Sequence, residues 1–259
     1  EGVPDEVDVL NDTPTNYESG GTVHGNFATW NPLSMGGNMT LSNGNLTATE
    51  GSSSAMNVRS TIGVTSGKYY WELTNNTNDY YRAGAGNTNS CAGIVGASKT
   101  NAEILGRASA DDYCIEYAGV TGSGATCKYW ANNSSTTDGL VIDKDDVLNI
   151  ACDFTAGKIW YGKNGTWFNS GDPGAGSNPS QTFTPGGKTW FAATTQRGAG
   201  ASTIATVNFG ARGSFKYDPP SGFKALCTQN LDDIFSGDAL NNPSKYFDVK
   251  TWNGTGADR

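Results

Sequence analysis

The stretch that decides the fold is residues 147–167, VLNIACDFTAGKIWYGKNGTW. Residues 147–154 and 158–163 are two short runs rich in apolar and aromatic side chains, which are typical of β-strands. The glycine-containing triplet 155–157 separates them, so the two runs are predicted to pair as a hairpin. Asn164-Gly165 then supplies the positive φ angles that a second tight turn needs. Two tight turns in so short a segment predict an all-β fold.

The same alternation of short runs and turns continues on both sides of this stretch. Asn43-Gly44 lies between two alternating runs and is the strongest short hairpin signal in the chain. Residues 169–180 predict a long turn-rich loop, and residues 223–240 show a short helical tendency. The remaining predicted strands are 39–41, 45–48, 56–62, 68–73, 80–86, 93–98, 112–118, 126–131, 190–194 and 204–209.

The composition favours strands and argues against long helices. The 259 residues include 35 Gly, and Asn, Ser and Thr are abundant, which favours turns and strand faces over helix interiors. Trp, Tyr and Phe number 7, 11 and 10, enough aromatic surface to build a core. We expect less than about 10% helix. One sandwich domain is predicted over 22–240, with a polar N-terminal arm at 1–21 and a polar tail at 241–259 that leads to a further module or a disordered region.

Charge and hydropathy exclude several classes of function. The net charge is −8 and no Lys/Arg cluster occurs, so we expect no nucleic-acid partner. No stretch approaches 18 uninterrupted apolar residues, so no membrane span is expected. The first residues lack the basic and apolar regions of a signal peptide and an initiator Met. We therefore expect a part of a longer or processed protein.

The five cysteines do not have metal-ligand spacing. Their number is odd and no CxxC motif occurs, so we expect buried, reduced thiols. One disulfide remains an alternative, between Cys114 and Cys127, because they lie in adjacent strand-like runs separated by a glycine-rich turn. The single histidine, His24, has no His or Cys neighbour, so neither a catalytic triad nor a metal site is expected.

Acidic pairs occur at Asp111-Asp112, Asp145-Asp146 and Asp232-Asp233. They do not fit a calcium-binding loop, and adjacent strand positions point to opposite faces. We interpret them as solvated turn carboxylates. The glycine-rich segments do not open a helix followed by Lys-Ser/Thr, so no phosphate site and no cofactor are expected.

Four segments, in order, resemble the SPRY family. They are 67–72 (GKYYWE), 146–153 (DVLNIACD), 157–167 (GKIWYGKNGTW) and 206–210 (TVNFG), which leads to 219–223 (PPSGF). The chain departs from the family pattern just before Asp146 and again near Asn149, where glycines are usual. The resemblance covers about residues 60–230 and implies an antiparallel, concanavalin-like β-sandwich of the jelly-roll type.

Within that fold the motif residues are interpreted as scaffold. Trp71 and Trp160 alternate with polar neighbours, so both are expected to point into the sandwich core. Glu72 and Lys158 are expected to face outward. The resemblance therefore predicts a fold, and a fold by itself does not determine function.

A narrower resemblance extends to the flanks of the sandwich. Residues 10–16, 27–33, 41–46 and 243–248 resemble SPRY-bearing proteins of tailed phages. This implies a virion protein, either a tail fibre or adhesin or, alternatively, a capsid decoration protein. Its partners would be other virion proteins or a host receptor, glycan or protein. A homo-oligomer is expected, with both arms lying on neighbouring subunits or on another virion protein.

A recognition surface is the site that we expect on such a sandwich, because end loops can present aromatic side chains beside Arg. Tyr81, Trp130 and Trp167 have the alternative role of ordinary core or edge aromatics. The candidate ligand-binding residues are Tyr80, Tyr81, Arg82, Trp130, Trp167 and Arg197.

The sequence thus predicts a non-enzymatic virion protein for attachment or assembly. One rival is an extracellular glycan-active enzyme, which needs two cleft-facing carboxylates about 5–10 Å apart. Glutamate is scarce, and most of the glutamates lie near turns or chain ends. A third reading is a cellular SPRY interaction module, which would lack the phage-like flanks.

Overall fold

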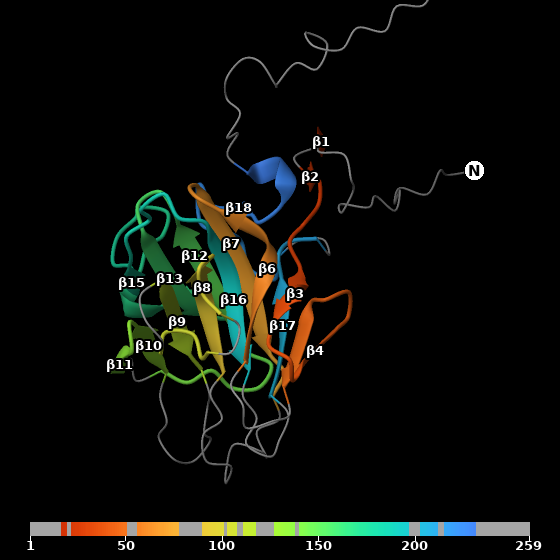
Figure 1. Cartoon of the computed structure of the whole chain (residues 1–259). Coiled ribbons are helices and arrows are strands. Elements are labelled where there is room, and N and C mark those ends of the chain that lie inside the picture. Colours follow the sequence, from red (N-terminus) through yellow and green to blue (C-terminus); the bar gives the residue numbers. More distant parts are fainter. Residues whose placement is uncertain are drawn as a thin grey trace, which may run out of the picture.

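The computed structural model shows a β-sandwich (Figure 1). It describes residues 17–19, 22–50, 56–77, 90–100, 103–107, 111–117, 127–137, 140–196, 203–211 and 215–231. No α-helix occurs among these residues, and none of their helical turns is long or apolar enough to cross a membrane. The all-β prediction is confirmed.

The first layer is a seven-stranded antiparallel sheet in the order β11-β10-β9-β8-β16-β6-β3. Its strands are β3 (Trp30–Met35), β6 (Met56–Val64), β8 (Cys91–Gly96), β9 (Asp112–Glu116), β10 (Lys128–Ala131), β11 (Ser134–Thr137) and β16 (Trp190–Gln196).

The second layer is a nine-stranded sheet whose main path is β14-β13-β12-β7-β17-β5-β4, with β15 paired to β13 and β18 to β7. Its strands are β4 (Met39–Ser42), β5 (Thr47–Glu50), β7 (Lys68–Asn75), β12 (Val147–Asp153), β13 (Lys158–Lys163), β14 (Thr166–Trp167), β15 (Gln181–Thr182), β17 (Thr203–Asn208) and β18 (Lys224–Ala225).

Tight turns set the register of the hairpins. Asn43 and Gly44 have φ angles of 56° and 66°, and they join β4 to β5 with Leu41 opposite Ala48. Asn164 and Gly165 have φ angles of 49° and 82° and join β13 to β14. Asparagine and glycine tolerate this left-handed region, which is why these sequences form turns between strands. Both predicted hairpins are confirmed.

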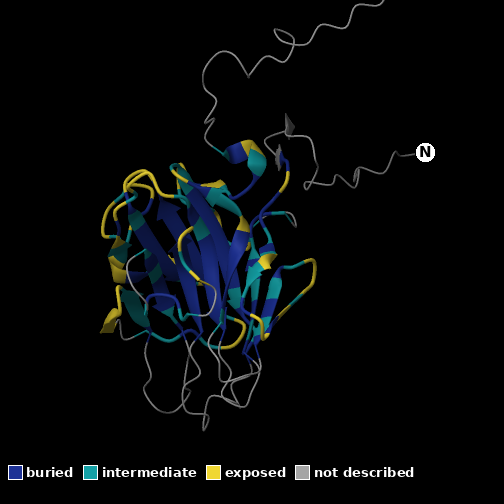
Figure 2. Cartoon of the chain, viewed as in Figure 1, coloured by how far each residue is buried: buried dark blue, intermediate teal, exposed yellow. Residues whose placement is uncertain are grey.

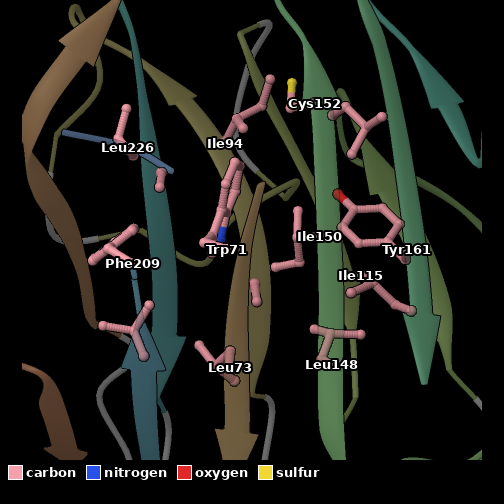
Figure 3. Close-up of a cluster of buried hydrophobic side chains, with 14 of the residues drawn as sticks. Trp71, Leu73, Ile94, Ile115, Leu148, Ile150, Cys152, Tyr161, Phe209 and Leu226 are labelled. Carbon is pink, nitrogen blue, oxygen red and sulfur yellow. The ribbon is translucent and has the colours of Figure 1, made fainter. Parts of the chain in front are cut away.

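The main core fills the space between the sheets. Trp71 lies there fully buried, as predicted, with Ile150 and Tyr161 from the neighbouring strands (Figure 3). Trp30 and Phe209 pack edge to face, with ring centroids 5.4 Å apart. Each such side chain contributes about 1.5–3 kcal/mol by burial, so these aromatic residues dominate the stability of the sandwich.

Trp160 corrects one expectation. It is fully buried, but on the outer face of the nine-stranded sheet, where it clusters with Tyr70, Ala151 and Phe223. Its strand neighbour Tyr161 takes the inward position instead. Side chains alternate along a strand, so Trp160 shares its face with Lys158, two residues away, and the two cannot face opposite ways.

Both sheets are therefore covered on their outer faces as well. Segment 215–231 lies on the nine-stranded sheet, where β18 pairs with β7. Leu105 packs on the seven-stranded sheet against Cys91 and Cys114. This double cover explains why all residues of β8 and β12 are buried (Figure 2).

The segments at which the chain enters and leaves the sandwich pair with each other at one corner. Ala28 N donates to Leu226 O, and Thr228 N donates to Asn26 O, each over 2.9 Å. Just before this pairing, β1 (Tyr17–Ser19) and β2 (Thr22–His24) form a two-stranded ribbon, so β1 lies within the segment predicted as an arm.

The helical tendency predicted at 223–240 is wrong for residues 223–231, which contain β18 and the short 3₁₀ turn η3 (Thr228–Asn230).

Candidate functional site

The six candidate ligand-binding residues do not form one site. Trp130 lies on the outer side of the seven-stranded sheet, and Trp167 packs on the outer side of the nine-stranded sheet. The core separates them. Tyr80, Tyr81, Arg82 and Arg197 lie outside the described residues.

Trp130 belongs to a half-exposed aromatic and charged cluster at the edge of the sandwich. The guanidinium of Arg107 stacks over the Trp130 ring, 4.3 Å from its centroid, and donates to Glu116 over 2.7 Å. The Trp130 indole N–H donates to the same Glu116 oxygen. Gly106 has a φ of 77°, and a Cβ there would lie 2.3 Å from the Trp130 Cβ. Only glycine lets this segment approach the tryptophan so closely.

Trp167 is a packing residue. Its ring meets Tyr70 edge to face, with centroids 6.3 Å apart, and it joins the cluster of Tyr70, Trp160 and Phe223. This is the alternative role foreseen for it, an ordinary edge aromatic.

Glu72 faces outward, as expected, but it is covered and only 3% exposed. The backbone N–H groups of Lys216 and Tyr217 donate to its two oxygens over 2.9 and 2.8 Å. The Tyr70 hydroxyl and the Asn208 amide donate to it as well. Four donors hold the carboxylate, which fastens segment 215–217 onto the sheet.

Asp146 holds a turn in a similar way. It accepts hydrogen bonds from the backbone of Asp143 and the side chain of Asn164, and it pairs with Lys163. Burial alone would raise the pKa of Asp146, but these partners together hold it below the ordinary value of 3.8. The carboxylate is thus a turn-stabilising group.

The other acidic pairs are also engaged or outside the described residues. Asp111 pairs with Lys188, whose side chain is half exposed, and Asp112 pairs with Lys99, whose side chain is 7% exposed. Asp112 is itself buried, so the expectation of solvated carboxylates is wrong for this residue. Asp232-Asp233 is not described. Among the described residues, no group of three His, Cys, Asp or Glu side chains could hold a metal ion.

All five cysteines are buried free thiols. The alternative Cys114–Cys127 disulfide is not formed, and the strand register gives the reason. Cys114 lies opposite Trp130, whereas Cys127 precedes Lys128, which lies opposite Glu116. The two cysteines are therefore well offset along the paired strands. Burial raises the pKa of the Cys114 and Cys152 thiols well above the ordinary value, which keeps both protonated.

A groove lies at the lateral edge of the sandwich. It has a volume of about 420 Å³ and lies where β10 and β11 of one sheet approach β15 and the 3₁₀ turn η2 (Phe168–Ser170) of the other. The lining residues are Tyr129, Ala131, Ser134, Thr136, Thr137, Asn169, Ser180 and Gln181.

Hydrogen bonds and stacking fix this groove in place. The Tyr129 ring stacks on Tyr161 at an interplanar angle of 17°. The Tyr161 hydroxyl donates to Gln181 Oε1 over 3.1 Å, and Gln181 Nε2 donates to the Trp130 carbonyl over 3.0 Å. Ser180 Oγ accepts from the Tyr161 backbone N–H. The two sheets are thereby joined across the floor of the groove.

Sequence reasoning missed this groove and strand β11. All four residues of β11, Ser134–Thr137, are exposed hydroxyl side chains, so no apolar alternation marks the strand. The missed signal was Asn132-Asn133, whose φ angles of 51° and 60° make the β10–β11 turn. Asparagine is, after glycine, a preferred residue for such turns.

Comparisons with known proteins give similarity to solved structures alone. No family model matches the sequence, and no curated protein matches it. The SPRY domain of human HERC1 is similar at 19% identity and a TM-score of 0.49, over 69% of this chain and 96% of that chain. The TRIM65 PSpry domain is similar at 14% identity and a TM-score of 0.47, over 70% of this chain and 89% of that chain. The stonustoxin structure is similar at 20% and 0.47, over 70% of this chain and 27% of that one.

Proposed function

We propose that the chain is a non-enzymatic binding module of a tailed-phage virion, part of a tail fibre or adhesin that mediates host attachment. The observation that carries the binding role is strand β10, which lies next to the edge strand β11. It presents the half-buried Tyr129 to the groove and the half-buried Trp130, with Arg107 and Glu116, to the opposite side. Aromatic and arginine side chains at a partly exposed edge are the groups that dominate recognition surfaces.

The non-enzymatic part of the proposal is supported by the roles of the carboxylates. Glu72 and Asp146 are occupied by donors that hold loops and turns. A glycan-active enzyme needs an acid and a second carboxylate facing one cleft. The described lining of the groove contains neither Asp nor Glu.

The virion location rests on the phage-like flanks and the SPRY-like motifs of the sequence. Partners would be other virion proteins or a host surface receptor, and the assembled form would be a homo-oligomer. The arms at 1–21 and 241–259, which would lie on neighbouring subunits, belong to the proposal, since the described part of the chain includes only Tyr17–Ser19 of them.

Labelling of the particle tests the location. Gold-labelled antibodies raised against residues 22–240 should decorate the tail in repeated copies. Label on the capsid would replace the tail-fibre role by head decoration. Particles that contain no such chain, by labelling and by mass spectrometry, would overturn the virion proposal.

Competition tests the binding role. The purified chain should reduce adsorption of the particle to its host, and Trp130→Ala should weaken that competition. Leu33→Ala is the matched control, because Leu33 is 94% exposed on β3, at the other edge of the same sheet. Thermal unfolding of both variants checks that they are folded. Equal competition by all three proteins would remove Trp130 from the proposed surface.

A further inference from the structure

We propose that the groove between β10–β11 and the segment Asn169–Gln181 binds a short, neutral oligosaccharide. The inference rests on the proposed binding function and names the ligand class of that module. Figure 1 shows β10, β11 and β15 together at one lateral edge of the sandwich.

The chemistry of the lining carries the argument. Serine, threonine, asparagine and glutamine supply hydroxyl and amide groups that both donate and accept hydrogen bonds, as sugar hydroxyls require. Tyr129 supplies an aromatic side chain beside them, suited to the apolar C–H face of a sugar ring. No described lining residue is charged, so the described lining offers no opposite charge to a phosphate, a carboxylate or an ammonium group.

The floor of the groove is also preorganised. Tyr129 is held flat against Tyr161, and both polar ends of the Gln181 amide are engaged. A site whose side chains are already fixed loses little conformational entropy when a ligand binds. Asn169, which contributes to the lining, has a φ angle of 56°. Asparagine accepts this left-handed conformation more readily than most residues.

Size and shape favour a small, extended ligand. The volume of about 420 Å³ lies within the range of about 300–1,000 Å³ that small-molecule sites occupy. The wall formed by β11 is exposed along its whole length, and Figure 2 shows it at the margin of the molecule. A longer glycan can therefore continue past the groove into solvent.

A peptide is the competing occupant, because β11 is the edge strand of its sheet and an added strand could pair with it. Such pairing uses backbone groups and is insensitive to the hydroxyls of β11. The saccharide proposal requires those hydroxyls. Side-chain substitutions therefore separate the two occupants.

Two conservative variants remove groove contacts and keep the fold. Thr136→Val replaces a hydroxyl by a methyl group on a residue whose strand partner is Tyr129, so it lies on the groove side. Asn169→Gly removes the amide, and glycine adopts the positive φ without strain. The matched control is Ser135→Ala, since Ser135 lies opposite Trp130 and so faces away from the groove.

Binding is measured first on an array of neutral and acidic oligosaccharides, and then by calorimetry with the neutral oligosaccharide that gives the strongest signal. We expect a neutral ligand to bind, with Thr136→Val and Asn169→Gly each weakening it about three- to tenfold, the size of one lost hydrogen bond. Ser135→Ala should bind like the unmodified chain.

Four results would each overturn the inference. They are binding of no neutral oligosaccharide, preference for acidic ones, equal binding by the groove variants, and a loss with Ser135→Ala as large as theirs. A peptide that binds equally to all the variants would assign the edge to strand addition. Gold labelling of the particle is independent of these outcomes, so failure of the saccharide inference and failure of the virion proposal can be told apart.

Discussion

The Tyr70 hydroxyl donates a hydrogen bond to Glu72 over 2.9 Å, between two residues on the same face of β7. The same hydroxyl accepts from the Asn149 amide over 2.7 Å, and Asn149 in turn accepts from the Gly165 backbone N–H over 2.8 Å. One chain of hydrogen bonds thus links the β13–β14 turn to the carboxylate that holds segment 215–217. Burial, followed by the charge of Glu72, raises the pKa of Tyr70, so its hydroxyl remains a donor across the physiological range.

Glu72→Gln should lower the free energy of unfolding by about 2–3 kcal/mol, because it replaces one accepting oxygen by an amide that faces donors. Urea unfolding measures the change. Glu103→Gln is the control and should cost less than about 0.5 kcal/mol, since Glu103 is half-buried and no hydrogen bond of its side chain is described. Equal losses in the two variants would contradict the anchoring role.

Asp146 should make stability depend on acid pH. Its pKa is lower in the folded protein than the ordinary 3.8, so the stabilisation is fully present above that value and is lost as pH falls toward the folded pKa. Asp146→Asn should reduce the slope of the unfolding free energy against pH below about pH 4. The control is Asp145→Asn, because that side chain is 68% exposed. A slope unchanged by Asp146→Asn would contradict the prediction.

Gly165→Ala should be more costly than Gly44→Ala. Both glycines have positive φ, at 82° and 66°, so alanine is strained at either site. A Cβ at Gly165 would also lie 2.7 Å from the Tyr217 ring, whereas nothing lies within 4 Å at Gly44. We expect a loss of about 1 kcal/mol at Gly44 and clearly more at Gly165, measured by thermal unfolding. Equal losses would show that the ring moves aside freely.

The five thiols should react with a thiol reagent slowly in the native protein, because all are buried. In denaturant without reductant, all five should react at once. If three reacted, and five did so only after reduction, one disulfide would be present, contrary to the structure. The number of thiols that react in denaturant, with and without prior reduction, decides between five free thiols and one disulfide.

The strands that could be predicted from sequence are those with local signals. The β12–β13 and β4–β5 hairpins were predictable because apolar runs and Asn/Gly turns act over a few residues. The face occupied by Trp160 was harder, since adjacent aromatics Trp160 and Tyr161 both suit a core. The register with β12, where Trp160 lies opposite Ala151, decides it.

The groove could not be predicted in the same way. It brings β10 and β11 together with residues 169–181, and that contact depends on how the two sheets stack. Neither segment alone has a pattern that indicates a ligand. Trp130 was predicted as a ligand-binding residue from its sequence, but its partners Arg107 and Glu116 come from elements whose proximity only the folded chain creates.

The joined corner of the sandwich has a mechanical consequence. Residues 26–28 and 226–228 pair antiparallel, so the chain enters and leaves the domain at neighbouring points. Tension applied through the preceding and following residues would pull these two segments apart along their hydrogen bonds. The bond between Thr228 and Asn26 would open first, and the bond between Ala28 and Leu226 would follow. Until this corner opened, the force would pass through these two segments alone. The two sheets would bear load only afterwards.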